Sequence, residues 1–159
     1  MGIYINPGNE VFRVKRNDTY IDKSGLIGVV NQTIGKRYKL SCISRPRRFG
    51  KSYAAQMLCA YYCVECDSAP LFDDLEIAKD ASYKVHLNQY NVIALDIADI
   101  IGKAGVNDTI SGITKVTSEE IYDLYPNIKK AGSLADLLYN VVEATGRKFI
   151  AIIDEWDAP

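Results

Sequence analysis

The chain has 159 residues, of which 48% are hydrophobic and 25% are charged, a composition typical of a globular protein with a buried core. Its 19 Lys and Arg residues nearly balance its 20 Asp and Glu residues, so the net charge of −1 excludes a protein that coats nucleic acid by bulk charge. No apolar run is long enough to predict a membrane span, and the N-terminus lacks the pattern of a secretory signal, so we expect a cytoplasmic protein.

The first half of the chain predicts two helices and one strand after an ordered lead-in over residues 1–19. Apolar residues at helical spacing predict a helix over 25–34 that ends before a glycine. A short apolar pattern predicts a strand over 37–44, and a basic, turn-rich loop follows it. The next helix is expected over 51–64.

The second half predicts two buried strands separated by helices. A near-continuous apolar run over 91–97 is typical of a buried parallel strand, and 148–155 has the same pattern. Residues 102–117 are rich in Gly, Asn, Ser and Thr and predict a loop, whereas 118–125 and 133–145 predict helices. This alternation predicts an α/β sandwich with a mainly parallel sheet, whose ligands bind at the carboxyl ends of the strands.

A partial phosphate-loop motif lies between the first predicted strand and the helix after it. Gly50, Lys51 and Ser52 fill the last three places of the pattern G-x-x-x-x-G-K-[ST], whereas Arg45 stands at the first glycine place. Backbone N–H groups at a helix N-terminus can surround a phosphate, and the Lys51 ammonium can reach the β- and γ-phosphates. The Ser52 hydroxyl can hold Mg²⁺, so the motif predicts binding of ATP with Mg²⁺.

Two acids end the last predicted strand and supply the second half of the expected site. The carboxylate of Asp154 can hold Mg²⁺ through water, and Glu155 can orient and polarise an attacking water. Asp96 is a rival metal-binding acid because it also ends an apolar run, which would favour a kinase-like phosphotransferase. No acid follows Asp96 directly, so we prefer Asp154.

The arginines of the basic loop allow three interpretations. Arg45, Arg47 and Arg48 can be solvated charges, can bind phosphate oxygens in fork geometry, or can form a nucleic-acid patch. The neighbouring Lys51 favours contact with the nucleotide. Nucleic acid as a partner has no further support in the sequence.

Four stretches of the chain resemble the prokaryotic predicted AAA-ATPase-like family. Residues 45–52 look like the family's distinctive phosphate loop, and 20–27 are similar to its Tyr-x-Asp-Lys-Thr/Ser-x-Leu-Ile opening. Residues 71–77 are similar to its Leu-Phe-x-x-Leu-x-Ile stretch, and 152–159 to its Asp-Glu-Tyr-Asp-x-Pro box. The resemblance implies a P-loop NTPase of the ASCE class, a three-layer α/β sandwich with a mainly parallel sheet.

The resemblance also implies the roles of the site residues. It assigns nucleotide binding to one continuous run: Arg45, Pro46, Arg47, Arg48, Phe49, Gly50, Lys51 and Ser52. It implies Lys51 and Glu155 as catalytic groups and Ser52 and Asp154 as metal ligands. ATP and Mg²⁺ are the implied substrate and metal, and an ATPase is the implied activity.

The expected organisation is one P-loop domain, with a lead-in and first helix over 1–36 and a core over 37–159. This core ends after the Walker B strand, which is the predicted strand over 148–155 that carries Asp154 and Glu155. Members of the family are usually longer, and many continue into a region resembling PD-(D/E)XK nucleases, which is the partner region the resemblance implies. Two alternatives stay open beside an ATPase: a nucleotide-gated module without turnover, and a nucleic-acid-binding domain that uses the basic loop. The sequence does not choose between ATP and GTP, or among oligomeric states.

Overall fold

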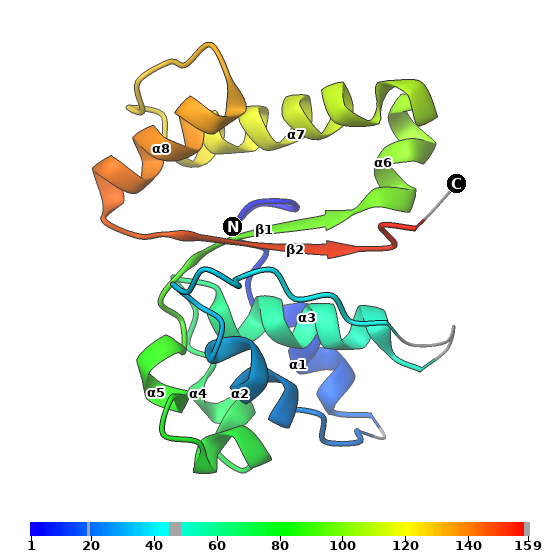
Figure 1. The fold of residues 1–159 in the computed structure, drawn as a ribbon, viewed down its shortest axis with the longest axis vertical. Coiled ribbons are helices and arrows are strands. Elements are labelled where there is room, and N and C mark those ends of the chain that lie inside the picture. Colours follow the sequence, from blue (N-terminus) through cyan, green and yellow to red (C-terminus); the bar gives the residue numbers. More distant parts are fainter. Residues whose placement is uncertain (19, 45–48, 158–159) are drawn as a thin grey trace. The chain divides into compact units, whose positions relative to one another are not determined.

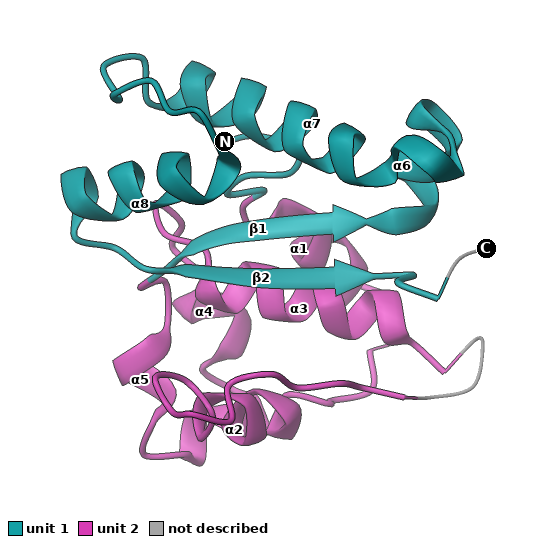
Figure 2. Cartoon of the chain, turned by 45° about the horizontal axis from the view of Figure 1, so that its top comes forward, with its two compact units in different colours: residues 1–7, 90–159 teal, residues 8–89 magenta. Residues whose placement is uncertain are grey.

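The computed structural model describes residues 1–18, 20–44 and 49–157. The chain divides into two compact units, one formed by residues 8–89 and the other by residues 1–7 together with 90–159 (Figure 2). In the part of the chain that the structure describes, no helix is both long and apolar enough to cross a membrane.

The unit of residues 8–89 is helical, and α3 is its longest helix (Figure 1). Its elements are, in chain order, α1 (Glu10–Arg16), α2 (Gly25–Asn31), α3 (Lys51–Tyr62), α4 (Ala69–Phe72), the 3₁₀ helix η1 (Glu76–Lys79) and α5 (Tyr83–His86).

Aromatic side chains form the core of this unit. Phe12 of α1 stacks on Phe72 of α4 with ring centroids 5.1 Å apart, and Tyr61 of α3 meets Phe72 edge-on at 5.5 Å. All three side chains are buried. The Tyr61 hydroxyl donates to the carbonyl of Tyr83 at 2.6 Å, so its polar end is satisfied inside the core. These tyrosine and phenylalanine contacts join α1, α3 and α4 into one packed body.

The other unit contains the sheet. Its elements are β1 (Asn91–Asp96), α6 (Ile97–Ala104), the 3₁₀ helix η2 (Val106–Asp108), α7 (Thr109–Leu124), α8 (Leu134–Thr145) and β2 (Phe149–Asp154). Strands β1 and β2 pair in parallel, and the register runs from Asn91 opposite Phe149 to Asp96 opposite Asp154. Both strands therefore end with an aspartate at the same edge of the sheet.

Helices α7 and α8 cover one face of this sheet (Figure 1). Apolar side chains from the N-terminal segment, β1 and the helices α6, α7 and α8 meet in a buried cluster: Tyr4, Ile5, Ile93, Leu95, Ile100, Ile121, Leu137 and Val141. Helix α8 begins where the Ser133 side chain accepts a hydrogen bond from the backbone N–H of Asp136, and ends at Gly146 in the left-handed region. The serine N-cap, the C-terminal glycine and the apolar face together define the bounds of α8, which match the helix predicted over 133–145.

The carboxylate of Glu120 in α7 holds the N-terminal segment. It accepts hydrogen bonds from the backbone N–H groups of Ile3 at 2.9 Å, Tyr4 at 2.8 Å and Ile5 at 2.8 Å. Ile5 also forms an antiparallel bridge with Ile93 of β1. One acid therefore satisfies three consecutive donors beside the sheet.

We expect Glu120→Ala to lower the free energy of unfolding by about 2 kcal/mol, since hydrogen bonds to a charged acceptor contribute more than neutral ones. Hydrogen exchange of the Ile3, Tyr4 and Ile5 amides measures the loss directly, because these three amides lose their acceptor. The matched control is Glu119→Ala, at an exposed position of the same helix. Equal protection of the three amides in both variants would show that Glu120 does not anchor this segment.

The structure confirms the mixed α/β class and the parallel pairing of the predicted strands 91–97 and 148–155. The helix predicted over 25–34 begins as expected but ends at Asn31, and the helix predicted over 51–64 ends at Tyr62. The described residues form a sheet of two strands, so the three-layer P-loop sandwich stays a prediction.

The strand predicted over 37–44 is wrong. These residues, all described, form no strand, and the side chains of Tyr38 and Leu40 are 81% and 93% exposed. Strands β1 and β2 pair with each other instead. A strand exists only where a neighbour accepts its backbone hydrogen bonds, and the local apolar pattern does not supply that neighbour.

The loop predicted over 102–117 is also wrong, because α6, η2 and α7 occupy it. Gly112 is one of the residues whose composition led to the loop prediction. A Cβ atom at Gly112 would lie 2.9 Å from the Cβ of Ala104 and 3.2 Å from Cγ2 of Ile100. The glycine therefore serves the close approach of α7 to α6 and does not break the helix.

Candidate functional site

The glycine-lysine-serine motif lies at the N-terminus of α3. Gly50 is the N-cap residue, with φ 78° and ψ 34° in the left-handed region that favours glycine. Lys51 and Ser52 are the first two residues of the helix, and the backbone N–H of Ala54 donates to the Gly50 carbonyl at 3.0 Å. The predicted start of this helix at Lys51 is confirmed.

This arrangement leaves backbone donors at the helix start. In any α-helix the first N–H groups have no carbonyl partner within the helix, so here those of Lys51, Ser52 and Tyr53 are oriented along the axis at its positive end. Such a terminus favours an anion. The side chains of Lys51 and Ser52 add an ammonium and a hydroxyl at the same end of α3.

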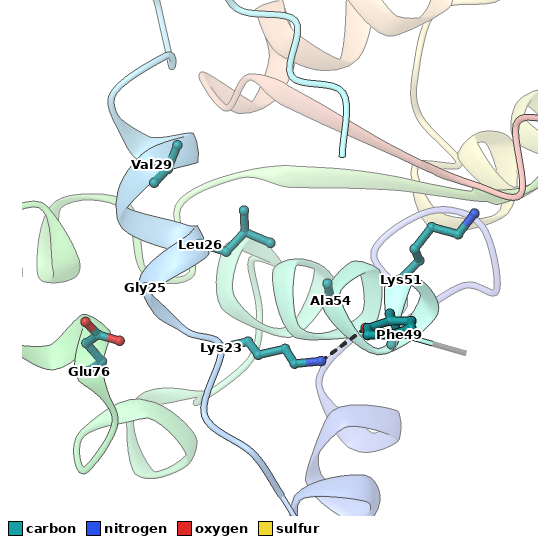
Figure 3. A pocket seen from close by; sticks show the side chains of 9 residues that line it. Lys23, Gly25, Leu26, Val29, Phe49, Lys51, Ala54 and Glu76 are labelled. Carbon is teal, nitrogen blue, oxygen red and sulfur yellow. Dashed lines mark hydrogen bonds between the residues drawn. The ribbon is translucent and has the colours of Figure 1, made fainter. Parts of the chain in front are cut away.

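A hollow of about 350 Å³ adjoins the motif within the unit of residues 8–89 (Figure 3). It is bordered by the start of α3, by α2 and by η1. The lining residues are Lys23, Gly25, Leu26, Val29, Phe49, Gly50, Lys51, Ala54 and Glu76. Two lysines, one glutamate and several apolar side chains thus border one space, and a lining that combines apolar side chains with a few polar groups is typical of small-ligand sites.

The segment before α2 is tied to η1 by Asp22. One carboxylate oxygen of Asp22 accepts from the backbone N–H of Ser24 at 2.8 Å, and the other accepts from the backbone N–H of Glu76 at 2.8 Å. Partial burial acts to raise the pKa of the Asp22 carboxyl, but these two donors oppose it and hold the pKa below its usual value. The Asp22 carboxylate therefore stays charged and fixes the border of the hollow.

The acids expected in the second half of the site lie at the end of β2. Asp154 is the last residue of the strand, and the backbone N–H of Glu155 donates to its carboxylate at 3.0 Å. Glu155 has φ 49°, in the left-handed region, where a non-glycine residue costs about 1–3 kcal/mol of strain. Such strain is concentrated at functional positions, and the sequence pattern alone does not reveal it.

The rival acid Asp96 has a structural role. It is the N-cap residue of α6, and its carboxylate accepts from the backbone N–H of Asp99 at 3.1 Å. Asp96 stands opposite Asp154 in the register of the sheet, so both acids end at one edge. No set of three or more His, Cys, Asp or Glu side chains within residues 1–18, 20–44 and 49–157 is arranged to hold a metal ion.

The candidate site residues predicted from the sequence lie in two groups along the chain. Phe49, Gly50 and Lys51 line the hollow at the start of α3, with Ser52 next in the helix. Asp154 and Glu155 follow one another at the end of β2. The remaining candidates of the basic loop lie outside the described residues: Arg45, Pro46, Arg47 and Arg48.

Lys23 and Glu76 are lining residues that the pattern of the sequence did not single out. Lys23 lies 26 residues before Phe49. The Lys23 ammonium donates a hydrogen bond to the Phe49 carbonyl at 3.1 Å (Figure 3). The stretches 20–27 and 71–77 that carry the family resemblance contain both residues. That resemblance is the signal that could have directed attention to them.

A glycine in the left-handed region is followed by lysine and serine at a helix start beside a hollow, and a helix start of this kind favours an anion. A family model described as Predicted AAA-ATPase matches residues 10–159. The chain belongs to this AAA-ATPase-like family, as the sequence motifs predict. No curated protein and no solved structure matches the chain.

Proposed function

We propose that the chain is the nucleotide-binding part of an ATPase, which binds ATP with Mg²⁺ and hydrolyses the bond between its β- and γ-phosphates. The observation that carries this proposal is the position of Gly50, Lys51 and Ser52 at the N-terminus of α3, in a chain that belongs to the AAA-ATPase-like family. The hollow beside these residues supports it, because a bound nucleotide needs space next to its phosphates.

Binding of the phosphates is assigned to the start of α3. The backbone N–H groups at the helix start donate to phosphate oxygens, and the Lys51 ammonium adds a charge-assisted contact. Gly50 fits this role because its left-handed backbone brings the chain into the helix without a side chain, and a Cβ there would lie 3.1 Å from Nζ of Lys23. Arg45, Arg47 and Arg48 are proposed to bind further phosphate oxygens through their guanidinium groups.

The metal is assigned to one hydroxyl and one carboxylate. The Ser52 hydroxyl and the Asp154 carboxylate would hold Mg²⁺, and oxygen donors of this kind are the ones that the ion prefers. The ion supplies positive charge to the phosphate oxygens when it is bound. A set of only two protein ligands is ordinary for Mg²⁺, which keeps several waters and binds the phosphates of its substrate.

Hydrolysis is assigned to Glu155. A water oxygen attacks the γ-phosphorus, the bond from that phosphorus to the bridging oxygen breaks, and ADP leaves with the bonding electrons. Glu155 orients the water and accepts its proton, as a carboxylate can do when it lies within hydrogen-bond reach. The left-handed backbone of Glu155 supports this assignment, because strained backbone conformations of non-glycine residues cluster at functional sites.

We expect Glu155→Gln to lower the rate of phosphate release about a hundredfold, since the amide keeps the shape of the side chain but does not accept the proton. The affinity for ATP with Mg²⁺ is expected to stay within about threefold, because Glu155 makes no contact in the binding step of this proposal. The measurement is phosphate release under single turnover, together with a binding titration of the same protein. The matched control is Glu143→Gln, at an exposed position of α8.

Two outcomes would contradict parts of the proposal. A Glu155→Gln variant that releases phosphate as fast as Glu143→Gln would remove Glu155 from the reaction. Binding of ATP with no phosphate release from the unmodified chain would favour the alternative function, a nucleotide-gated module without turnover. The two readouts separate these cases because one reports affinity and the other reports chemistry.

A further inference from the structure

Lys23 makes a contact with the residue that precedes the glycine of the motif. Its ammonium donates to the backbone carbonyl of Phe49 at 3.1 Å, across 26 residues of chain (Figure 3). Phe49 is the residue before Gly50, so the contact lies at the end of the candidate phosphate loop. Lys23 and Lys51 also line the same hollow.

The carbonyl that Lys23 holds belongs to the peptide bond between Phe49 and Gly50. None of the described peptide bonds is cis, so the C=O and the N–H of this peptide point in opposite directions. A donor that fixes the Phe49 carbonyl therefore also fixes the direction of the Gly50 N–H. The hydrogen bonds of α3 do not fix the peptide between Phe49 and Gly50, because the helix begins only at Lys51.

Lys23 is itself held from both sides along the chain. On one side the Asp22 carboxylate accepts from the backbone N–H groups of Ser24 and Glu76. On the other side the buried hydroxyl of Ser24 accepts from the backbone N–H of Ile77 at 3.1 Å. The residues on both sides of Lys23 are therefore hydrogen-bonded to η1. These bonds hold the Lys23 backbone in the position from which its ammonium contacts the Phe49 carbonyl.

We propose that Lys23 is a positioning residue of the phosphate-binding site: its ammonium holds the peptide between Phe49 and Gly50, so that the Gly50 N–H and the start of α3 keep the conformation that binds phosphate. This inference rests on the proposed function. It assigns Lys23 a role that acts through the loop backbone and is distinct from the direct phosphate contact assigned to Lys51. Glycine has a wider choice of backbone conformations than other residues, and Lys23 restrains the peptide that precedes Gly50.

The test compares Lys23→Met, which keeps the length of the side chain but has no donor, with Lys23→Arg, which keeps a charged donor. Lys79→Met in η1 is the matched control, because Lys79 is exposed and lies outside the lining of the hollow. Lys23→Gln is a second neutral variant, and thermal unfolding checks that each protein is folded. The first readout is the amide resonance of Gly50 in the protein without nucleotide, with Gly35 as the reference resonance.

We expect the Gly50 amide resonance to move in Lys23→Met and Lys23→Gln, to stay near its original position in Lys23→Arg, and to be unchanged in Lys79→Met. The affinity for ATP with Mg²⁺ is expected to fall about tenfold in the two neutral variants, the size of effect that one charge-assisted hydrogen bond supplies. Lys23→Arg is expected to restore the affinity to within about threefold of the unmodified chain, because a single backbone carbonyl can accept from either charged donor.

The outcomes separate this inference from the proposed function. If Lys51→Ala loses binding while Lys23→Met keeps both the affinity and the Gly50 resonance of the unmodified chain, the inference is overturned and the proposed function stands. If the Gly50 resonance moves but the affinity does not, the contact exists without positioning the site, and the inference is again overturned. If Lys51→Ala binds ATP as the unmodified chain does, the proposed function fails and the inference fails with it.

Discussion

Replacement of Lys51 by alanine is expected to lower the affinity for ATP with Mg²⁺ about a hundredfold, because a charged partner of the phosphates is lost at a site that borders a hollow. The remaining donors of the helix start cannot replace it, since each backbone N–H carries only a partial charge. Displacement of a fluorescent ATP analogue measures the loss. Lys51→Arg is expected to recover only part of the affinity, because a planar guanidinium does not occupy the place of a compact ammonium.

The control for the Lys51 variants is Lys79→Ala, which removes one exposed positive charge from the same unit. It separates a local contact from a change in the overall charge, which acts over a distance and is weakened by salt. Equal affinity of Lys51→Ala and Lys79→Ala for the nucleotide would show that the motif does not bind phosphate.

Replacement of Phe72 by alanine is expected to lower the free energy of unfolding by about 3–5 kcal/mol. The Phe72 side chain is fully buried, stacks on Phe12 at 5.1 Å and meets Tyr61 edge-on at 5.5 Å. Its removal leaves a cavity where α1, α3 and α4 meet, and the loss of aromatic pairing adds to the loss of burial. Urea unfolding followed by circular dichroism measures the change.

The matched control for Phe72→Ala is Phe49→Ala, measured without nucleotide. The Phe49 side chain is 59% exposed, so the same chemical change is expected to cost less than about 1 kcal/mol. A similar loss of stability in both variants would contradict the packing described for the aromatic core.

The parts of the fold that the sequence predicts well carry their signals locally. Helix α8 has a serine cap, an apolar face and a glycine stop within fourteen consecutive positions, Ser133 to Gly146. Strand β2 is an apolar run that ends at Asp154. The start of α3 at Lys51 follows from the glycine before it. Each of these features is complete without reference to distant residues.

The predictions that are wrong depend on partners elsewhere in the chain. Residues 37–44 have an apolar pattern but no strand, because a strand is defined by its neighbour. Gly112 suggests a loop, yet the contact of α7 with Ala104 is what requires a small residue there. Threonine in α7 also argues against a helix by propensity, but burial of Ile121 of this helix in the apolar cluster of the unit outweighs that local preference.

The candidate site shows the same division. The motif around Lys51 and the acid Asp154 could be predicted, because each stands at the end of a recognisable element. The contact of Lys23 with the Phe49 carbonyl could not, since 26 residues separate them. The left-handed backbone of Glu155 could not be predicted either, because the apolar pattern of a strand does not indicate a positive φ at the residue that follows it.

The most direct test of the proposed site is a calorimetric titration of the unmodified chain with ATP, with and without Mg²⁺. We expect saturable binding of one nucleotide per chain that depends on Mg²⁺, since Ser52 and the phosphates are proposed to share the ion. The absence of binding in the presence of Mg²⁺, or binding that is unchanged when Mg²⁺ is removed and Lys51 is replaced, would contradict it.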